Sequence, residues 1–400
     1  MAAGSQSGPV RRADWAVEPT LDWLLRDARL LGDLRLVVER LCERLAEAGA
    51  PVWRFYLGLQ TLHPQLRAMA FLWTRGQPAR GVERLHGIQQ TAAYIGSPIQ
   101  EVRQSRRRVR HRLDELGPDH HPVLHELRAE GGTDYVAWPM AFSRGEVPVV
   151  TLATDDPGGF SDADIGKFDR VLDHLAALAE AQVMYRIGVT LMETYMGRHT
   201  GHRILEGLIR RGDGETIRAV LWFCDMRNFT GLSETLPSDR MLAMLNEYFE
   251  VLDAALRPQG GEILRFVGDG VLAIFPVSDA MFLPQACSSA VTAAQDAIRR
   301  MAHANAARAE RGEPEIRFGV GLHVGSFTYG NIGTRDRLDF TVIGPAVNRC
   351  VRLEGLSKTL GVTIVTSAEF NANCPQTMVS LGFHALRGIE LPQEIFTPSV

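Results

Sequence analysis

The spacing of hydrophobic residues changes along the chain and predicts different elements in its two halves. Apolar side chains recur every three or four positions over 34–50, which predicts an amphipathic helix. The segments 66–76, 133–142 and 146–155 are rich in β-branched and aromatic residues and predict strands. A turn containing glycine and proline follows at 155–159. The first half is therefore predicted to combine helices with a sheet.

A long helix is predicted to leave this region. Ser161 and Asp164 have the spacing of a capping box, which marks a helix start, and Gly197 is a stop signal. Four apolar residues of this helix follow a 3-4-3 spacing: Ile165, Phe168, Leu172 and Leu175. Such a stripe can pair with a copy of itself and favours a dimeric connector. Packing inside its own domain would give the same spacing.

The second half of the chain predicts a single sheet domain. Its expected elements are a strand at 217–226, a helix at 237–256, a hairpin at 262–276, a helix at 280–309, strands at 316–333 and 339–344, and a helix at 345–360. This β-α-β-β-α-β order is that of a ferredoxin-like split βαβ sheet, so the fold class is α+β. In such a sheet the first strand and the hairpin lie side by side.

The composition limits the class of protein. A chain of 400 residues with 45% hydrophobic content is long enough for two or three domains. Its formal net charge of -4 gives no electrostatic reason to expect a nucleic acid or an anionic membrane as partner. A small phosphate site remains compatible with this charge.

Cysteine usage and the length of apolar runs predict the compartment. Five scattered cysteines include no Cys-x-x-Cys pair, so neither a zinc cage nor a disulfide framework is expected. The N-terminal segment lacks the apolar core of a signal peptide, and no run of 18 apolar residues occurs. We therefore expect a cytoplasmic protein.

Two aspartates in the second half are candidates for metal binding. Asp225 ends a predicted strand and Asp269 lies at the hairpin tip, where an Asp-Gly pair predicts a type I′ turn. A cap or turn role would explain either residue alone. Together at one sheet edge they would suit two Mg²⁺ or Mn²⁺ ions and two-metal phosphoryl chemistry. The segment 227–232, with Phe229 and Thr230, would present backbone N–H groups to a phosphate.

Asn348 and Arg352 lie four residues apart and therefore share one face of the last predicted helix. An arginine can neutralise charge that develops on a phosphorus centre, and an amide can hold a ribose oxygen. A solvated helix face would give the same pattern. Arg349 and Glu354 are expected to belong to that solvated face.

Four segments together resemble the catalytic domain of class III nucleotidyl cyclases, the adenylate and guanylate cyclases. The resemblance covers about 217–400 and rests on FCDMRNFTGL, ILRFVGDGVLAIF, FGVGLHVGSFTYGNIG and DFTVIGPAVNRCVRLEGL. It implies that Asp225 and Asp269 bind the metal ions. It also implies that Asn348 and Arg352 act in the transition state.

The resemblance implies how the base is recognised. Arg265 stands where adenylate cyclases usually carry lysine and guanylate cyclases glutamate, and Thr341 stands at the second purine position. Arg387 stands where a phosphate-binding lysine is common. Arginine carries only donors and suits the N1 acceptor of adenine, while Thr341 can accept from the adenine amino group. Guanine N1–H would lack the usual acceptor, so ATP is the expected substrate.

In this family the metal aspartates come from one subunit and the purine and transition-state residues from the other. A chain with both sets is therefore expected to form a homodimer that converts ATP to cyclic AMP and pyrophosphate. Two alternatives stay open: the same reaction on GTP, and a degenerate domain used for nucleotide binding or dimerisation. The second alternative is motivated by Arg265 and Arg387, which replace the usual residues.

Four parts of the chain are predicted. They are a flexible tail at 1–19, a sensor domain at 20–160, a helical signalling linker at 161–214 and the cyclase domain at 215–400. The sensor domain resembles GAF-type modules. Such modules often precede cyclases, so the first half is expected to receive an unidentified small-molecule or protein signal.

Overall fold

The computed structural model describes residues 14–62 and 65–399. The chain divides into two compact units, Met1–Leu191 and Met192–Val400, and each is considered by itself. Within the described residues, no helix has both the length and the apolar character needed to cross a bilayer.

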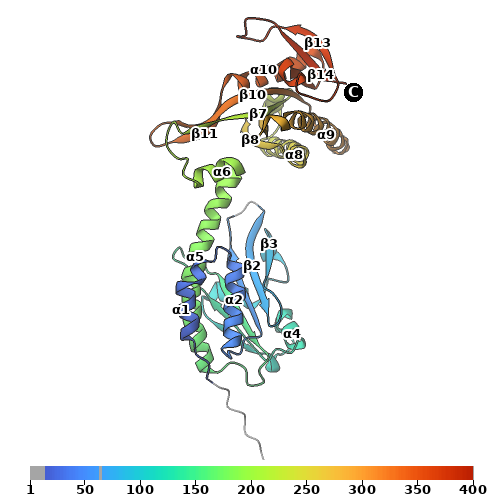
Figure 1. Ribbon diagram of the computed structural model, residues 1–400. Coiled ribbons are helices and arrows are strands. Elements are labelled where there is room, and N and C mark those ends of the chain that lie inside the picture. The colour runs from blue at the N-terminus through green and yellow to red at the C-terminus, as the bar shows by residue number, and fades with distance from the viewer. Residues whose placement is uncertain (1–13, 63–64, 400) are drawn as a thin grey trace, which may run out of the picture. The chain divides into compact units, whose positions relative to one another are not determined.

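The first unit is built on a six-stranded antiparallel sheet with the strand order β3-β2-β1-β6-β5-β4 (Figure 1). Its strands are β1 (Arg54–Gln60), β2 (Leu66–Thr74), β3 (Arg80–Leu85), β4 (Val109–Arg112), β5 (Asp134–Pro139) and β6 (Val149–Thr154). The three strands predicted from the sequence are β2, β5 and β6 and are confirmed. Alternate residues of β5 face opposite sides, so Val136 and Trp138 join one core while Tyr135 and Ala137 join another.

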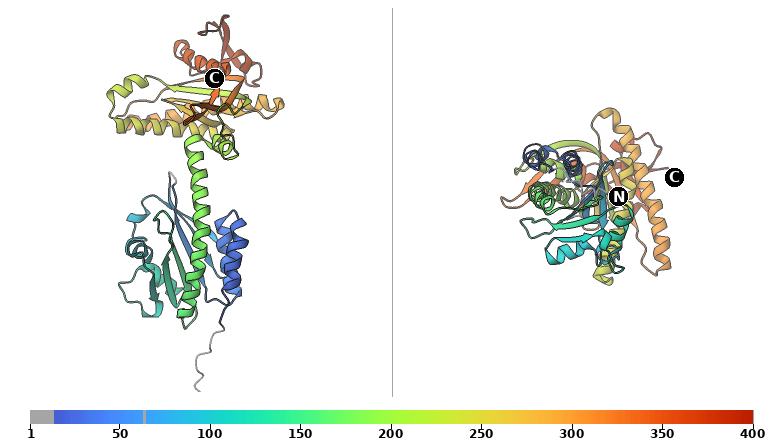
Figure 2. Two further views of the ribbon diagram at one scale, coloured as in Figure 1. Left: turned by 90° about the vertical axis from the view of Figure 1, so that its left-hand side faces the viewer. Right: turned by 90° about the horizontal axis from the view of Figure 1, so that it is seen from below.

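Helices cover both faces of this sheet. They are α1 (Glu18–Arg26), α2 (Leu34–Glu47), α3 (Pro98–Ser105), α4 (Pro122–Ala129) and α5 (Asp162–Met196). α1, α2 and α5 pack on the larger core, and α3 and α4 on the smaller one. Figure 2 shows α5 in green running along the same unit as the blue helices. The helix predicted over 34–50 is α2 and is confirmed.

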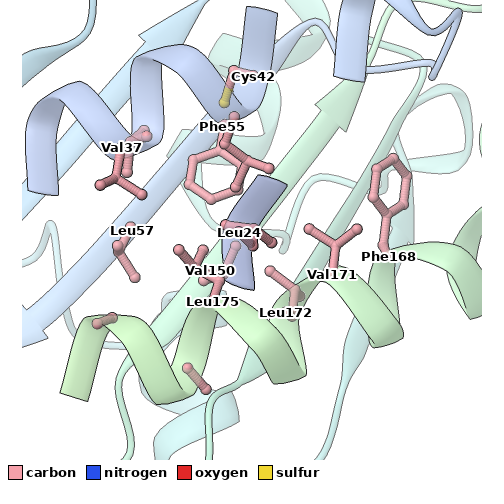
Figure 3. Close-up of a cluster of buried hydrophobic side chains, with 14 of the residues drawn as sticks. Leu24, Val37, Cys42, Phe55, Leu57, Val150, Phe168, Val171, Leu172 and Leu175 are labelled. Carbon is pink, nitrogen blue, oxygen red and sulfur yellow. The ribbon is translucent and has the colours of Figure 1, made fainter. Parts of the chain in front are cut away.

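The capping box at the start of α5 is confirmed, because Ser161 N–H and Oγ–H donate to Asp164 while Asp164 N–H donates to Ser161 Oγ. The helix ends at Gly197, whose φ of 83° requires glycine. The expectation of a dimeric connector at the 3-4-3 stripe is wrong. Phe168 is 1% exposed and Leu175 is 0% exposed, and both lie in the core with Phe55 and Val150 (Figure 3). This stripe therefore packs inside its own unit.

The predicted tail at 1–19 is wrong where it can be tested; residues 1–13 lie outside the described residues. Trp15 is 3% exposed, and its ring packs at a tilt against that of Phe168 with the ring centroids 5.4 Å apart. Its indole N–H donates to Asp164 at 2.7 Å, and α1 begins at Glu18. Burial of one large aromatic side chain thus fixes this segment to the core.

The second unit has an eight-stranded sheet ordered β13-β14-β12-β10-β7-β9-β8, with β11 paired to β10. Its strands are β7 (Gly214–Met226), β8 (Glu262–Val267), β9 (Gly270–Pro276), β10 (Phe318–Gly333), β11 (Leu338–Ile343), β12 (Ile364–Ser367), β13 (Met378–His384) and β14 (Gln393–Pro398). The predicted β-α-β-β-α-β order is present as β7, α8, β8, β9, α9 and β10. β7 lies between β9 and β10, so the first strand adjoins the hairpin as expected.

Helices cover this second sheet as well. They are α6 (Arg198–Leu205), α7 (Phe229–Thr235), α8 (Ser238–Leu256), α9 (Leu283–Glu310), α10 (Pro345–Leu360) and α11 (Ala368–Asn371). α8 and α9 run side by side over one face, where Val220 and Trp222 of β7 are buried (Figures 1 and 2). α10 packs on the opposite side of β7 and β10. It approaches so closely that a Cβ at Gly321 would lie 2.5 Å from Cys350 O, which explains the glycine.

Candidate active site

The hairpin between β8 and β9 places Asp269 at its tip. Val267 pairs with Gly270, so the two connecting residues are Gly268 and Asp269. Only Gly268 has a positive φ, of 62°, and the expected type I′ turn is therefore wrong. Glycine at the first connecting position is the pattern of a type II′ turn, which suits the twist of a hairpin equally well.

The hairpin tip brings Asp269 to Asp225. Asp225 is the penultimate residue of β7, and its neighbour Cys224 pairs with Val271 of β9. A Cβ at Gly270 would lie 3.3 Å from Asp225 Oδ1. Burial, the charge of Asp269 and a hydrogen bond with Asp269 raise the pKa of Asp225 to about 6. The structure thus brings the two predicted aspartates together.

The two carboxyl groups fit a divalent cation. Besides burial, the charge of Asp269 raises the pKa of Asp225, and a cation between the two carboxyl groups would remove their repulsion. Oxygen ligands of this kind suit Mg²⁺ or Mn²⁺, which keep other positions for water and phosphate oxygens. Within the described part of the chain, no group of three or more His, Cys, Asp or Glu side chains could hold a metal ion. Other ligands would therefore come from substrate and water.

Glu354 of α10 adds a buried carboxyl that the sequence reasoning had assigned to a solvated face. Glu354 is 5% exposed, and its Oε1 lies 3.0 Å from Arg227 Nη1. Burial raises its pKa to about 7; Arg227 opposes this rise, and Asp225 and Asp269 add to it. The helical spacing could have predicted this burial. Glu354 lies four residues, about one turn, after Cys350 and therefore on the same helix face, and Cys350 is also buried.

The two residues expected to contact the base also meet. Arg265 Nη1 donates to Thr341 Oγ1 at 2.7 Å, although 76 residues separate them. A register shift between Ile263 and Arg265 marks a β-bulge, a feature that redirects side chains. Arg265 Nη2 also lies 2.8 Å from Asp339 Oδ2. Asp339 was missed, although its position two residues before Thr341 places both on one side of β11.

The remaining predicted residues lie on α10 and on the loop before β14. Asn348 is exposed and Arg352 is half-buried on α10. A Cβ at Gly388 would lie 3.5 Å from Arg352 Nη2, so the loop of the exposed Arg387 passes beside this guanidinium. Among the described side chains, neither Arg352 nor Arg387 forms an ion pair. Both positive charges thus remain available to an anion.

Phe229 and Thr230 differ in their surroundings. α7 begins at Phe229, after Asn228 in a left-handed conformation with φ of 61°. Phe229 is half-buried and packs against the core beneath α8 and α9. Thr230 is exposed in the first turn. The Phe229 side chain therefore serves packing, and the backbone of this turn is what faces solvent.

Comparisons with known proteins identify this domain. Residues 215–390 match the family model described as the adenylate and guanylate cyclase catalytic domain. Adenylate cyclase 1 of Rhizobium meliloti is 34% identical over 154 residues, which are 38% of this chain and 23% of that protein. The adenylate cyclase of Anabaena cylindrica is 32% identical over 171 residues, 42% of this chain and 34% of that protein. The second unit therefore contains a class III cyclase catalytic domain.

A solved structure is similar to about half of this chain. The adenylyl cyclase CyaB from P. aeruginosa is 27% identical, with a TM-score of 0.41, over 47% of this chain and 96% of that chain. This chain matches only about a quarter to a third of the length of the curated relatives named above.

Proposed function

We propose that the protein is an adenylate cyclase that converts ATP to 3′,5′-cyclic AMP and pyrophosphate. The observation that carries this proposal is the meeting of Asp225 and Asp269 at one edge of a domain that matches the cyclase family. The two relatives named above are adenylate cyclases, which favours ATP over other nucleotides.

In the proposed reaction the ribose 3′-oxygen attacks the α-phosphorus of the same nucleotide. Asp225 and Asp269 would hold two Mg²⁺ or Mn²⁺ ions, which when bound lower the pKa of the attacking hydroxyl and neutralise the triphosphate. Arg352 stabilises the charge on the pentacoordinate phosphorus, and Asn348 orients the ribose. Arg387 and the turn that begins at Phe229 and Thr230 bind phosphate oxygens.

The base contacts favour adenine. Arg265 donates to N1, and Thr341 accepts from the amino group, so both polar groups on this edge of adenine find partners. One observation favours GTP as a second candidate substrate. The Asp339 carboxylate beside Arg265 could accept from guanine N1–H while Arg265 donates to O6.

The active form is proposed to be a homodimer, with the base and transition-state residues of one chain facing the metal residues of the other. Exposed apolar side chains close in sequence to the proposed site residues support this assembly: Phe266 at 52%, Val267 at 55%, Ile343 at 48% and Val351 at 39% exposure. Apolar groups that surround functional polar residues commonly mark an interface.

The first unit is proposed to regulate the cyclase domain as a GAF-like sensor of a small molecule or a protein. Its support is α5, a single helix that starts in the core of the first unit and ends at Met196, which packs in the second. A continuous helix can transmit a displacement from one end to the other.

Nucleotide turnover tests this function. Purified protein is given ATP and GTP separately, with Mg²⁺ or Mn²⁺, beside the variant Asp269→Asn. Cyclic AMP that disappears in the variant supports the proposal, and cyclic GMP instead makes the protein a guanylate cyclase. If neither nucleotide reacts, the domain is a binding or dimerisation module.

A further inference from the structure

Arg227 and Glu354 form an ion pair directly beside the two aspartates. We infer that this pair tunes the affinity of Asp225 and Asp269 for a cation and holds the metal-bearing end of β7 against α10. The inference deepens the proposed function and rests on its assignment of the aspartates as cation ligands. Arg227 and Glu354 are then positioning residues, because they act through Asp225.

The pair joins two elements that carry different parts of the site. Arg227 follows Asp225 by two residues, and Glu354 follows Arg352 by two residues. Arg227 Nη1 lies 3.0 Å from Glu354 Oε1, and Arg227 Nη2 donates to Ser357 Oγ one turn further along α10. Two contacts from one guanidinium therefore fix α10 relative to the end of β7.

A glycine in β10 makes room for this pair. Gly319 is the cross-strand partner of Asp225. A Cβ at Gly319 would lie 2.6 Å from Glu354 Oε1 and would also overlap Arg227 Nη2 and Ser357 Oγ. The side-chain space beside Asp225 is therefore filled by the pair, which places both charges next to the cation site.

Because the ion pair is largely buried, its charges act strongly on a cation bound at the two aspartates. The side chains of Arg227 and Glu354 are 21% and 6% exposed, so water and salt screen them poorly. While both are charged, they cancel at the aspartates. Removing the negative charge of Glu354 leaves Arg227 to repel a cation, and removing the positive charge of Arg227 leaves Glu354 to attract one.

Substitution of Arg227 and substitution of Glu354 should therefore change cation binding in opposite directions. Binding of Mn²⁺ alone to the full-length protein is measured by the loss of the free-ion electron paramagnetic resonance signal. Glu354→Gln is expected to weaken Mn²⁺ binding about tenfold, whereas Arg227→Gln tightens it. The double variant Arg227→Gln/Glu354→Gln restores the balance and returns the affinity to within about twofold of the unchanged protein.

A matched control uses another ion pair of α10, which Arg349 of this helix forms with Glu369 of α11. Glu369→Gln breaks the 2.6 Å contact of Glu369 with Arg349 and should leave Mn²⁺ binding unchanged. Asp225→Asn should abolish binding and so identifies the site. If either single variant fails to fold, the other variant and the double variant carry the test, with melting temperatures as the check.

Two outcomes overturn the inference: single variants that shift Mn²⁺ binding in the same direction, or a protein that binds no Mn²⁺ at Asp225. A merely structural pair would give the first outcome, because either substitution breaks the same contact. The measurement is independent of turnover. Opposite shifts in a protein that makes no cyclic nucleotide would therefore support the inference and reject the proposed function.

Discussion

Two carboxylate clusters, one in each unit, balance their charge differently. In the first unit, Asp134 is fully buried, and Arg110 Nη2 donates to it at 2.7 Å while the Phe160 N–H donates at 3.0 Å. In the second unit, Asp225 and Asp269 face each other, and burial together with the charge of Asp269 raises the pKa of Asp225. Donors of the chain itself balance the negative charge of Asp134, whereas the combined charge of Asp225 and Asp269 is not fully balanced.

The difference separates a structural carboxylate from a functional one. A buried charge that has its full set of donors is compatible with a stable fold, and removing one of its partners is destabilising. A pair of carboxyls that repel each other destabilises the fold until a cation arrives. Burial and an arginine neighbour occur in both clusters, so neither feature alone marks a site. The surplus of negative charge does.

The largest effect is expected from Asp225→Asn. Cyclic nucleotide formation should fall by about 1,000-fold, because metal-ion stabilisation of a phosphoryl transition state is worth several kcal/mol. The melting temperature of the cation-free protein should stay equal or rise, since repulsion with Asp269 is removed. Asp253→Asn, which removes an exposed carboxylate paired with Arg257 on α8, is the matched control. Activity that survives in Asp225→Asn would reject the two-metal mechanism.

Asp134→Asn is expected to lower the stability of the protein, whereas Asp225→Asn is expected to lower its activity. The folded state should lose about 3 kcal/mol, because the charge-assisted hydrogen bonds that the buried carboxylate accepts from Arg110 and from the Phe160 N–H are weakened. Denaturant unfolding of the full-length protein measures this loss. Asp155→Asn removes an exposed pair with Arg75 in the same unit and should change the free energy of unfolding by less than about 1 kcal/mol. Equal losses in both variants would show that burial at Asp134 adds nothing.

The sequence predicted elements whose signal is local. The cap at Ser161, the hairpin around Asp269 and the strand that ends near Asp225 each follow from a few neighbouring residues, and all are present. Local signals sufficed for the candidate site because its aspartates lie at the ends of strands that are neighbours in the predicted sheet.

Features that depend on distant partners were missed. The stripe that includes Phe168 has the spacing of an apolar helix face, but spacing does not say whether a sheet or a second chain covers it. Glu354 forms an ion pair with Arg227 and Asp339 forms one with Arg265, and both partners are far away in sequence. Trp15 was assigned to a tail because its partner, Phe168, lies 153 positions later.

A pH effect of intermediate size should also distinguish the clusters. The pKa of Asp225 is raised from 3.8 to about 6, so the folded state binds a proton more tightly than the unfolded chain. Stability is therefore lost as the pH rises from about 4 to 6, and the loss is complete above pH 6. Glu354 acts with the same sign, between 4.5 and about 7.

His323 has the opposite sign, because burial lowers its pKa from 6.5 to about 4 and favours the folded state as the pH rises. The test is therefore the difference in melting temperature between the unchanged protein and Asp225→Asn, measured from pH 4 to 7 without divalent cations. That difference should grow in favour of Asp225→Asn up to pH 6. Added Mn²⁺ should then stabilise the unchanged protein alone. A difference that does not vary with pH would contradict the raised pKa of Asp225.

The smallest effect is expected at the base contacts, where an ion pair lies in solvent. Arg265 and Asp339 are 40% and 48% exposed, so the pair contributes little to stability and modestly to orientation. Asp339→Asn should raise the KM for ATP about threefold and leave kcat unchanged, because Thr341 still fixes the guanidinium. Turnover with GTP should fall further if the carboxylate accepts from guanine N1–H, which makes the ATP-to-GTP ratio the informative readout. A loss of kcat comparable to that of Asp225→Asn would place Asp339 among the buried, charge-determining residues rather than on the exposed rim of the site.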